Sequence, residues 1–159
     1  MQSRSNWFQA SPGVAKALLN LQGFVNKSGL EHSLLELVKM RASQINGCAY
    51  CIDMHTKDAR AAGETEQRLY LLDAWREASH LYNERERAAL VWTEAVTNVR
   101  DGHVPDEAYE EVRAHFTEAE LVNLTLAVTS INSWNRLNIA FRVPAGDYVP
   151  GMFKQAMGA

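Results

Sequence analysis

Apolar residues recur every three or four positions along almost the whole chain, and this spacing limits the possible folds more than any other feature. One stretch shows the pattern most clearly, with apolar side chains on a single helical face at Leu34, Leu35, Val38, Ala42 and Ile45. No stretch alternates between apolar and polar residues with the period of two that a half-buried strand requires. The sequence therefore predicts an all-α fold, a bundle of about six to seven helices.

Start and stop signals divide this pattern into segments. Ser11-Pro12 is typical of a helix start, while Asn46-Gly47 and Gly63 are typical of helix ends. Two capping boxes, which pair an N-cap side chain with a glutamate three residues later, predict helix starts after residues 83 and 117. The predicted helices cover about 12–28, 34–45, 48–62, 65–79, 84–100, 105–115 and 118–141.

The 159 residues suit one domain, 1–159, with an irregular tail from about residue 144, where prolines and glycines gather. The net charge is −3 with both signs interspersed, which argues against a nucleic-acid-binding surface. No apolar run approaches the roughly 20 residues of a membrane span. The first residues lack the apolar core of a signal peptide, so we expect a cytoplasmic protein.

The chain has two cysteines, and they lie three residues apart in "INGCAYCIDMH", residues 45–55. In a reducing compartment a close pair is more often catalytic or metal-binding than a static disulfide. Zinc is one alternative, because Cys48, Cys51, His55 and Glu36 offer ligands of the right kinds, although no second ligand cluster is present. Two buried, inert cysteines are another alternative.

Cys48, Cys51 and His55 occupy positions i, i+3 and i+7 of the predicted third helix, and so share one face. The sulfurs can then approach each other, so a reversible disulfide is plausible. A helix N-terminus favours an anion and lowers a thiol's pKa, and the imidazole can accept the proton. If residues 46–47 fold the second and third helices into a hairpin, Glu36 faces and orients His55, giving a Glu–His–Cys relay.

The stretch "ELVKMRASQINGCAYCIDMHTKDARAAG", residues 36–63, resembles the alkyl hydroperoxidase AhpD and carboxymuconolactone decarboxylase-like families, in particular their small redox-active members. Glu36, Cys48, Cys51 and His55 match the family pattern at the expected spacing. The closing "INSWNRLNIAFR" also looks like the last helix of those members. The resemblance covers most of the chain and is most specific in a redox core at about 31–63.

The resemblance implies a thiol peroxidase that reduces hydrogen peroxide or organic hydroperoxides. It makes Cys51 the peroxidatic thiolate and Cys48 the resolving thiol, with His55 and Glu36 carrying the proton. The resolving thiol intercepts the sulfenic acid before irreversible over-oxidation, and an external dithiol, in the family sometimes a lipoyl-bearing protein, then restores the pair. The family also implies a homo-oligomer, a trimer or hexamer. No haem, flavin or metal cofactor is required, and no nucleic-acid or membrane partner is expected.

Tyr50 departs from the family pattern, because the best-studied members carry a histidine directly before the second cysteine. A phenol is a poor base near neutral pH, so the relay must work with His55 alone or with lower efficiency. Two other functions stay open: a disulfide exchanger or redox sensor without peroxidase turnover, and, with less support, a decarboxylase-type lyase. For Trp134 and Arg136 we favour packing and pairing with a carboxylate over substrate contact.

Overall fold

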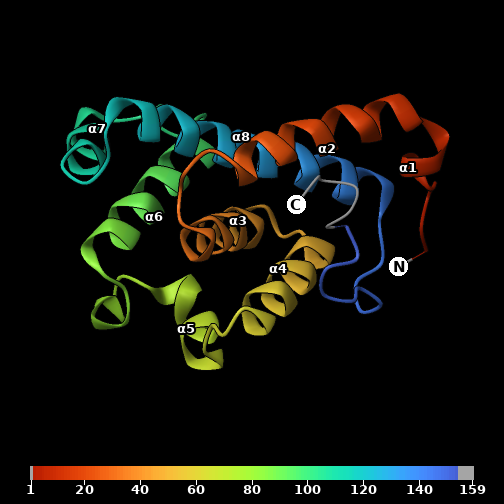
Figure 1. Cartoon of the computed structure of the whole chain (residues 1–159), viewed down its shortest axis with the longest axis horizontal. Coiled ribbons are helices and arrows are strands. Elements are labelled where there is room, and N and C mark those ends of the chain that lie inside the picture. Colours follow the sequence, from red (N-terminus) through yellow and green to blue (C-terminus); the bar gives the residue numbers. More distant parts are fainter. Residues whose placement is uncertain (1, 154–159) are drawn as a thin grey trace.

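The computed structural model describes residues 2–153, and in that range it is all-helical, as predicted (Figure 1). Eight α-helices and two short 3₁₀ helices occur in it, against the six to seven helices expected. In chain order they are α1 Trp7–Ala10, α2 Pro12–Asn26, α3 His32–Asn46, α4 Ala49–Ala61, α5 Glu66–Leu71, η1 Leu72–Ala74, η2 Ser79–Leu81, α6 Glu84–Thr97, α7 Asp106–Arg113 and α8 Glu118–Phe141.

Helix α3 is the centre of the bundle, where it packs against α4, α6 and α8 (Figure 1). Every residue from Leu34 to Met40 is buried, so α3 lacks the solvent-facing side of an ordinary amphipathic helix. Two separate apolar cores flank it. Leu34, Leu35 and Val38 enter the core shared with α6 and α8, and residues 37 and 40 enter the core shared with α5 and η1. Its remaining side carries polar side chains into the interior.

The prediction of one α-helix over 65–79 was wrong. The regular helix α5 ends at Leu71 and is followed by 3₁₀ helices and turns. The buried residues of this segment are spaced three apart: Leu69, Leu72, Trp75 and Ala78. A 3₁₀ helix has 3.0 residues per turn and aligns such residues, whereas an α-helix, at about 100° per residue, would put the first and last on opposite faces.

Helix α1 was not predicted. Its N-cap is Asn6, whose side chain accepts a hydrogen bond from the backbone N–H of Gln9 at 3.2 Å. Ahead of it, the backbone N–H of Arg4 donates to the carbonyl of Phe141 at 3.1 Å, so the N-terminal segment lies against the end of α8. Trp7 is the buried residue of α1 and anchors the segment in the interior.

The other predicted boundaries agree with the structure to within a few residues. Both capping boxes form, at Asn83 with Glu86 and at Thr117 with Glu120. Residues 144–153 contain no helix, and the last part of the predicted irregular tail, 154–159, lies outside the described residues. Within the described residues, no helix combines the length and apolar character needed to cross a membrane.

The capping boxes allow a matched test of helix stability. In Asn83→Ala, α6 loses the side chain that accepts from Glu86 N at 2.9 Å, and we expect the free energy of unfolding to fall by about 1 kcal/mol. Ser11 is the control, because it is the N-cap of α2 but its side chain makes no capping hydrogen bond. Ser11→Ala should change stability by less than about 0.5 kcal/mol. Urea unfolding followed by circular dichroism measures both, and equal losses would contradict the assignment.

Candidate active site

The Cys-x-x-Cys pair lies at a tight junction between α3 and α4. Gly47 has φ +69°, a left-handed conformation that suits glycine, and closes α3. The N–H of Cys48 donates to the carbonyl of Ser43, and Cys48 is also the N-cap of α4. Asn46 ties the junction to α8 by donating to the side-chain oxygens of Asn132 and Asn135, both at 2.9 Å. The turn is therefore held from three helices.

Cys48 and Cys51 are joined by a disulfide, with their Cα atoms 5.3 Å apart, a usual separation for a disulfide. Cys51 is the third residue of α4, within the turn whose backbone N–H groups lack helical carbonyl partners. Both cysteines are buried, with 1% and 0% of their surface exposed. The spacing that the sequence displays thus does bring the two sulfurs together at a helix N-terminus.

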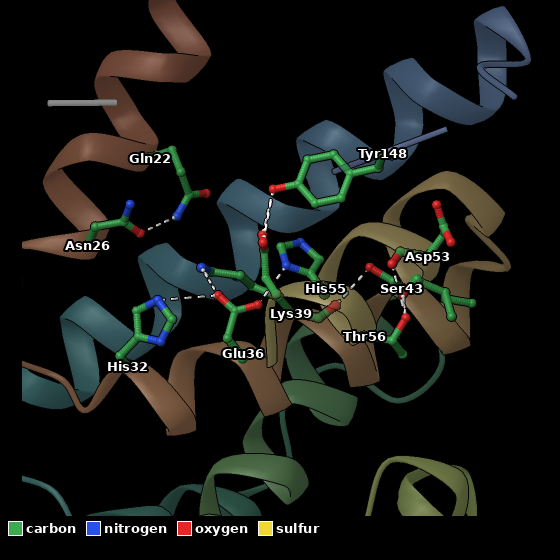
Figure 2. A network of polar contacts seen from close by, with 12 residues as sticks. Gln22, Asn26, His32, Glu36, Lys39, Ser43, Asp53, His55, Thr56 and Tyr148 are labelled. Atoms are coloured by element: carbon green, nitrogen blue, oxygen red, sulfur yellow. Dashed lines mark hydrogen bonds and ion pairs between the residues drawn. The ribbon is translucent and has the colours of Figure 1, made fainter. Parts of the chain in front are cut away.

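Glu36 occupies the buried polar side of α3 and contacts three cations or potential cations (Figure 2), of which the exposed His32, with Nε2 at 3.9 Å from Oε1, is the most distant. One carboxylate oxygen, Oε2, lies 2.8 Å from His55 Nδ1, and the other, Oε1, lies 2.9 Å from Lys39 Nζ. The side chains of Glu36, Lys39 and His55 are buried. Glu36 and His55 therefore face each other across the helical hairpin, as expected.

The charge state of Glu36 follows from this arrangement. Burial by itself raises the pKa of its carboxyl, but the charges and hydrogen bonds of Lys39 and His55 outweigh burial and hold the pKa well below its ordinary value. An ionised Glu36 accepts a hydrogen bond from His55 Nδ1, so the neutral imidazole has its free lone pair on Nε2. That nitrogen is buried and has no hydrogen-bond partner within the described chain.

A cavity of about 850 Å³ reaches this group from outside. Cys51, His55, Glu36 and Lys39 all contribute to its wall, whereas Cys48 does not. Much of the remaining wall is apolar and includes Trp7, Phe8, Met54, Ile131, Trp134 and Val143. Trp134 packs against the ring of Trp7, as expected, and also lines the cavity. The expected carboxylate partner of Arg136 is not found among residues 2–153, where its guanidinium donates to Asn132.

The segment after α8 forms one side of this cavity and is tied to α4. Lys57 Nζ donates to the carbonyls of Gly146 and Tyr148, at 2.7 and 3.1 Å. The hydroxyl of Tyr148 donates to the carboxylate of Asp58, at 2.8 Å for the shorter contact (Figure 2). The tail, for which the sequence predicts only irregular structure, is thus fixed beside α4 by two charged side chains of α4.

Tyr50 also lines the cavity, one residue before Cys51. Burial raises the pKa of its phenol, and the nearby carboxylates of Asp53 and Asp58 raise it further. Tyr50 therefore remains protonated at neutral pH, where it can donate a hydrogen bond but cannot act as a base. This agrees with the expectation that a phenol does not replace the family histidine in proton transfer.

The zinc alternative finds no support in the geometry. Among residues 2–153, no group of three or more histidine, cysteine, aspartate or glutamate side chains is arranged to hold a metal ion. The four candidate ligands contact one another instead: the sulfurs form a disulfide, and His55 Nδ1 faces the carboxylate of Glu36.

The sequence model of the carboxymuconolactone decarboxylase family matches residues 12–95, which is more than half of the chain. The chain belongs to the carboxymuconolactone decarboxylase family. The matched range runs from α2 to α6 and contains Glu36, both cysteines and His55. It does not include α1, α8 or the tail, so the parts of this family member that complete the cavity lie outside the matched range.

Relatives extend the similarity over nearly the full length. The chain is 44% identical over 140 residues to YdfG, an uncharacterized protein of Bacillus subtilis (strain 168), in an alignment that spans 88% of this chain and 95% of YdfG. A solved structure from Agrobacterium tumefaciens, ATU0492, is 46% identical with a TM-score of 0.89, covering 92% of this chain and all of that one. ATU0492 is a protein of unknown function, provisionally assigned to antioxidant defence as AhpD.

The fold also occurs in a more distant enzyme, the debrominase Bmp8. Its structure has a TM-score of 0.75 and 21% sequence identity, and the alignment covers 88% of this chain and 75% of Bmp8. At that identity the likeness shows a common helical fold and nothing about the reaction.

Three residues of the site escaped the sequence reasoning. Lys39 lies one helical turn after Glu36 on the same face, a spacing that could have indicated an ion pair. Asn138, which also lines the cavity, lies within the closing stretch that resembles the family's last helix, but its side chain carried no signal of its own. Trp7 precedes every predicted helix, and its place in the cavity wall depends entirely on how the N-terminal segment docks against α8.

The ion pair of Glu36 should dominate the stability of the site. Glu36→Gln leaves the Lys39 ammonium buried without its counter-charge, and we expect the free energy of unfolding to fall by about 3–5 kcal/mol. When Lys39→Met is added to Glu36→Gln, the double variant should recover much of this loss in the free energy of unfolding, because the uncompensated charge is removed. Glu110→Gln, on the exposed surface of α7, is the control and should unfold like the parent in urea.

The same pair predicts a pH dependence. Since the pKa of Glu36 is lower in the folded chain than its ordinary value of 4.5, the unfolded chain binds the proton more readily. The stability that Glu36 contributes is complete above pH 4.5 and is lost as the pH falls toward the folded pKa. Urea unfolding between about pH 3 and 6 should therefore show a shallower loss for Glu36→Gln than for the parent; parallel curves would contradict it.

Proposed function

We propose that this chain is a thiol-dependent peroxidase that reduces organic hydroperoxides, and also hydrogen peroxide, through Cys51 and Cys48. One observation carries the proposal. His55 is held by Glu36 through Nδ1, its Nε2 is buried without a partner, and His55 shares the wall of an apolar cavity with Cys51. A base with a fixed tautomer, one helical turn from a thiol at a helix N-terminus, is suited to generating a thiolate.

The first proposed step forms a sulfenic acid. His55 Nε2 takes the thiol proton of Cys51, and Glu36 stabilises the resulting imidazolium, as carboxylates do in other relays. The thiolate then donates an electron pair to the distal oxygen of the hydroperoxide, and the O–O bond breaks. The sulfur becomes a sulfenic acid, and the departing alkoxide takes the proton from His55 and leaves as an alcohol.

The second and third proposed steps restore the enzyme. The Cys48 thiol attacks the sulfenic acid of Cys51, water leaves, and the disulfide seen in the structure forms. An external dithiol then reduces this disulfide. One thiolate of the dithiol attacks a sulfur of the pair and forms a mixed disulfide, and the second thiol of the dithiol attacks that mixed disulfide and releases the protein thiol. The net reaction consumes one hydroperoxide and one dithiol and gives an alcohol, water and an oxidised dithiol.

The burial of the sulfurs supports a slender reductant. With at most 1% of either cysteine exposed, a folded protein surface has no direct contact with the disulfide. The cavity reaches Cys51 but not Cys48, so attack on Cys51 is the step we favour. A dithiol on a flexible arm, such as a lipoyl group, fits this requirement. Disulfide exchange between this chain and a folded protein substrate fits it less well.

The third expected partner is a second copy of the same chain, in a trimer or hexamer as the family resemblance implies. Phe24 on α2 and Val122 on α8 are large apolar side chains exposed on adjacent helices, with 58% and 68% of their surface accessible. We propose that this assembly forms in solution, which sedimentation velocity measures directly.

The peroxidase hypothesis predicts distinct results for substitutions of the two cysteines. With a dithiol reductant, peroxide consumption should be lost in Cys51→Ser, because the attacking sulfur is gone. Cys48→Ser should leave a sulfenic acid on Cys51 that a dimedone probe traps, seen by mass spectrometry. In the parent, one equivalent of peroxide should remove two hydrogens from the intact mass. A sulfenic acid found on Cys48 in the Cys51→Ser variant would reverse the assignment.

The cavity predicts a preference for bulky substrates. An apolar space of about 850 Å³ offers much more contact area to cumene hydroperoxide than to hydrogen peroxide. Val143→Trp fills part of this space, and we expect kcat/KM for cumene hydroperoxide to fall roughly tenfold while that for hydrogen peroxide changes little. Val149→Trp, in the same segment but 60% exposed, is the control. Equal losses for both peroxides would indicate damage to the thiol rather than to the substrate space.

A further inference from the structure

The sulfur of Cys51 has a hydrogen-bond donor that comes from outside the Cys–His–Glu group. The side-chain amide of Asn138 on α8 directs Nδ2 toward Cys51 Sγ at 3.4 Å. Both residues are buried, and Asn138 also contributes to the cavity wall. Hydrogen bonds from a neutral donor to a charged acceptor are stronger than those between neutral groups, so this contact favours the thiolate over the thiol.

The orientation of this amide is set by a second contact. Trp7 Nε1 donates to Asn138 Oδ1 at 3.2 Å. An indole N–H is a donor only, so it selects the amide oxygen and leaves the NH₂ group on the side of the sulfur. Trp7 is itself held by its burial in α1 and by ring contact with Trp134 at 5.8 Å between centroids. The donor therefore faces Cys51 in one defined orientation.

We propose that Asn138 is a catalytic residue that stabilises the Cys51 thiolate by a direct hydrogen bond, and that Trp7 is the positioning residue that keeps its amide in the donating orientation. The need for such a donor follows from burial. Cys51 has no exposed surface, and taking a thiolate out of water disfavours it unless donors replace the lost solvation. The helix N-terminus and Asn138 together supply that replacement from two different helices.

This role lies beyond the part of the chain that matches the family model. Asn138 and Trp7 fall outside residues 12–95, on elements that lie more than 130 positions apart in the sequence. The docking of the N-terminal segment on α8 thus adds the amide of Asn138 to the two groups that the matched range supplies, His55 and the N-terminus of α4. The inference uses the proposed function only to identify Cys51 as the reactive sulfur.

The experiment measures the ionisation of Cys51 without any peroxide. In a Cys48→Ser chain, Cys51 is the one remaining thiol, and the rate of its alkylation by iodoacetamide against pH gives its apparent pKa. Asn138→Leu keeps a similar volume but lacks the donor. We expect the apparent pKa to rise by about one to two units, and the alkylation rate below that pKa to fall roughly tenfold or more.

Asn123→Leu is the matched control, because it is the same substitution on the same helix. It removes one hydrogen bond, from Nδ2 to the carbonyl of Ser28 at 3.1 Å, without contact to the sulfur. Its pH profile should equal that of the Cys48→Ser parent. Every variant keeps the other titratable side chains of the cavity, so a shift in the apparent pKa of Cys51 reports the loss of the Asn138 amide. These side chains are Glu36, Lys39, Tyr50, His55, Asp58, His32 and Tyr148.

Trp7→Phe keeps an aromatic ring but removes the indole N–H together with the rest of the five-membered ring, and it tests the proposal if Asn138→Leu does not fold. We expect a smaller rise in the same apparent pKa, and no further rise when Trp7→Phe is added to Asn138→Leu. A pH profile of Asn138→Leu, or of Trp7→Phe where the former does not fold, that coincides with the parent would overturn the proposal. Absence of peroxide turnover in the unsubstituted chain, together with the expected shifts in the Cys51 profiles of the variants, would instead overturn the proposed function.

Discussion

The structure depends on a buried carboxylate on its central helix. Glu36 lies on α3, which is enclosed by other elements along most of its length, and a charge in that place is tolerated because Lys39 and His55 bind its two oxygens. Desolvation opposes the ionised form, and these two partners outweigh desolvation. The same contacts fix the tautomer of His55. The ionised carboxylate therefore makes α3 compatible with the core and orients the imidazole of His55, which we propose as the base for Cys51.

The surroundings of the cysteine pair are assembled from four segments that are distant in sequence: the N-terminal residues, the α3–α4 junction, α8 and the tail. The junction of α3 and α4 presents the two cysteines, and Asn46 ties that junction to α8. The first residues dock on the end of α8, while the tail returns to α4 through Lys57 and Asp58. Both ends of the described chain thus help to wall the cavity. A buried sulfur with access through an apolar cavity suits a small hydrophobic oxidant better than it suits a protein substrate.

Membership of the carboxymuconolactone decarboxylase family leaves the reaction open, because a common helical fold is shared with a debrominase as well as with a protein assigned to antioxidant defence. What separates the possible reactions is the environment of the sulfur. A protonated Tyr50 beside Cys51 leaves His55 as the base in the mechanism that we propose, and Asn138 on α8 supplies a hydrogen bond to the sulfur. These local features, rather than the fold, support peroxide chemistry.

The sequence by itself determined the helical class, most helix boundaries and the placement of Cys48, Cys51 and His55 on one helical face, whereas Glu36 was added to them by the family resemblance. Those features depend on local spacing: helical periodicity, capping boxes and side chains three, four or seven positions apart are visible in one stretch of chain. The broken segment after α5 was hidden, because a spacing of three is compatible with either helix type until burial is known. Only the tertiary structure decided that Trp7 orients Asn138 beside the sulfur of Cys51 and that the tail closes the cavity. Such contacts join residues up to more than a hundred positions apart, and no local pattern records which distant side chains will pack together.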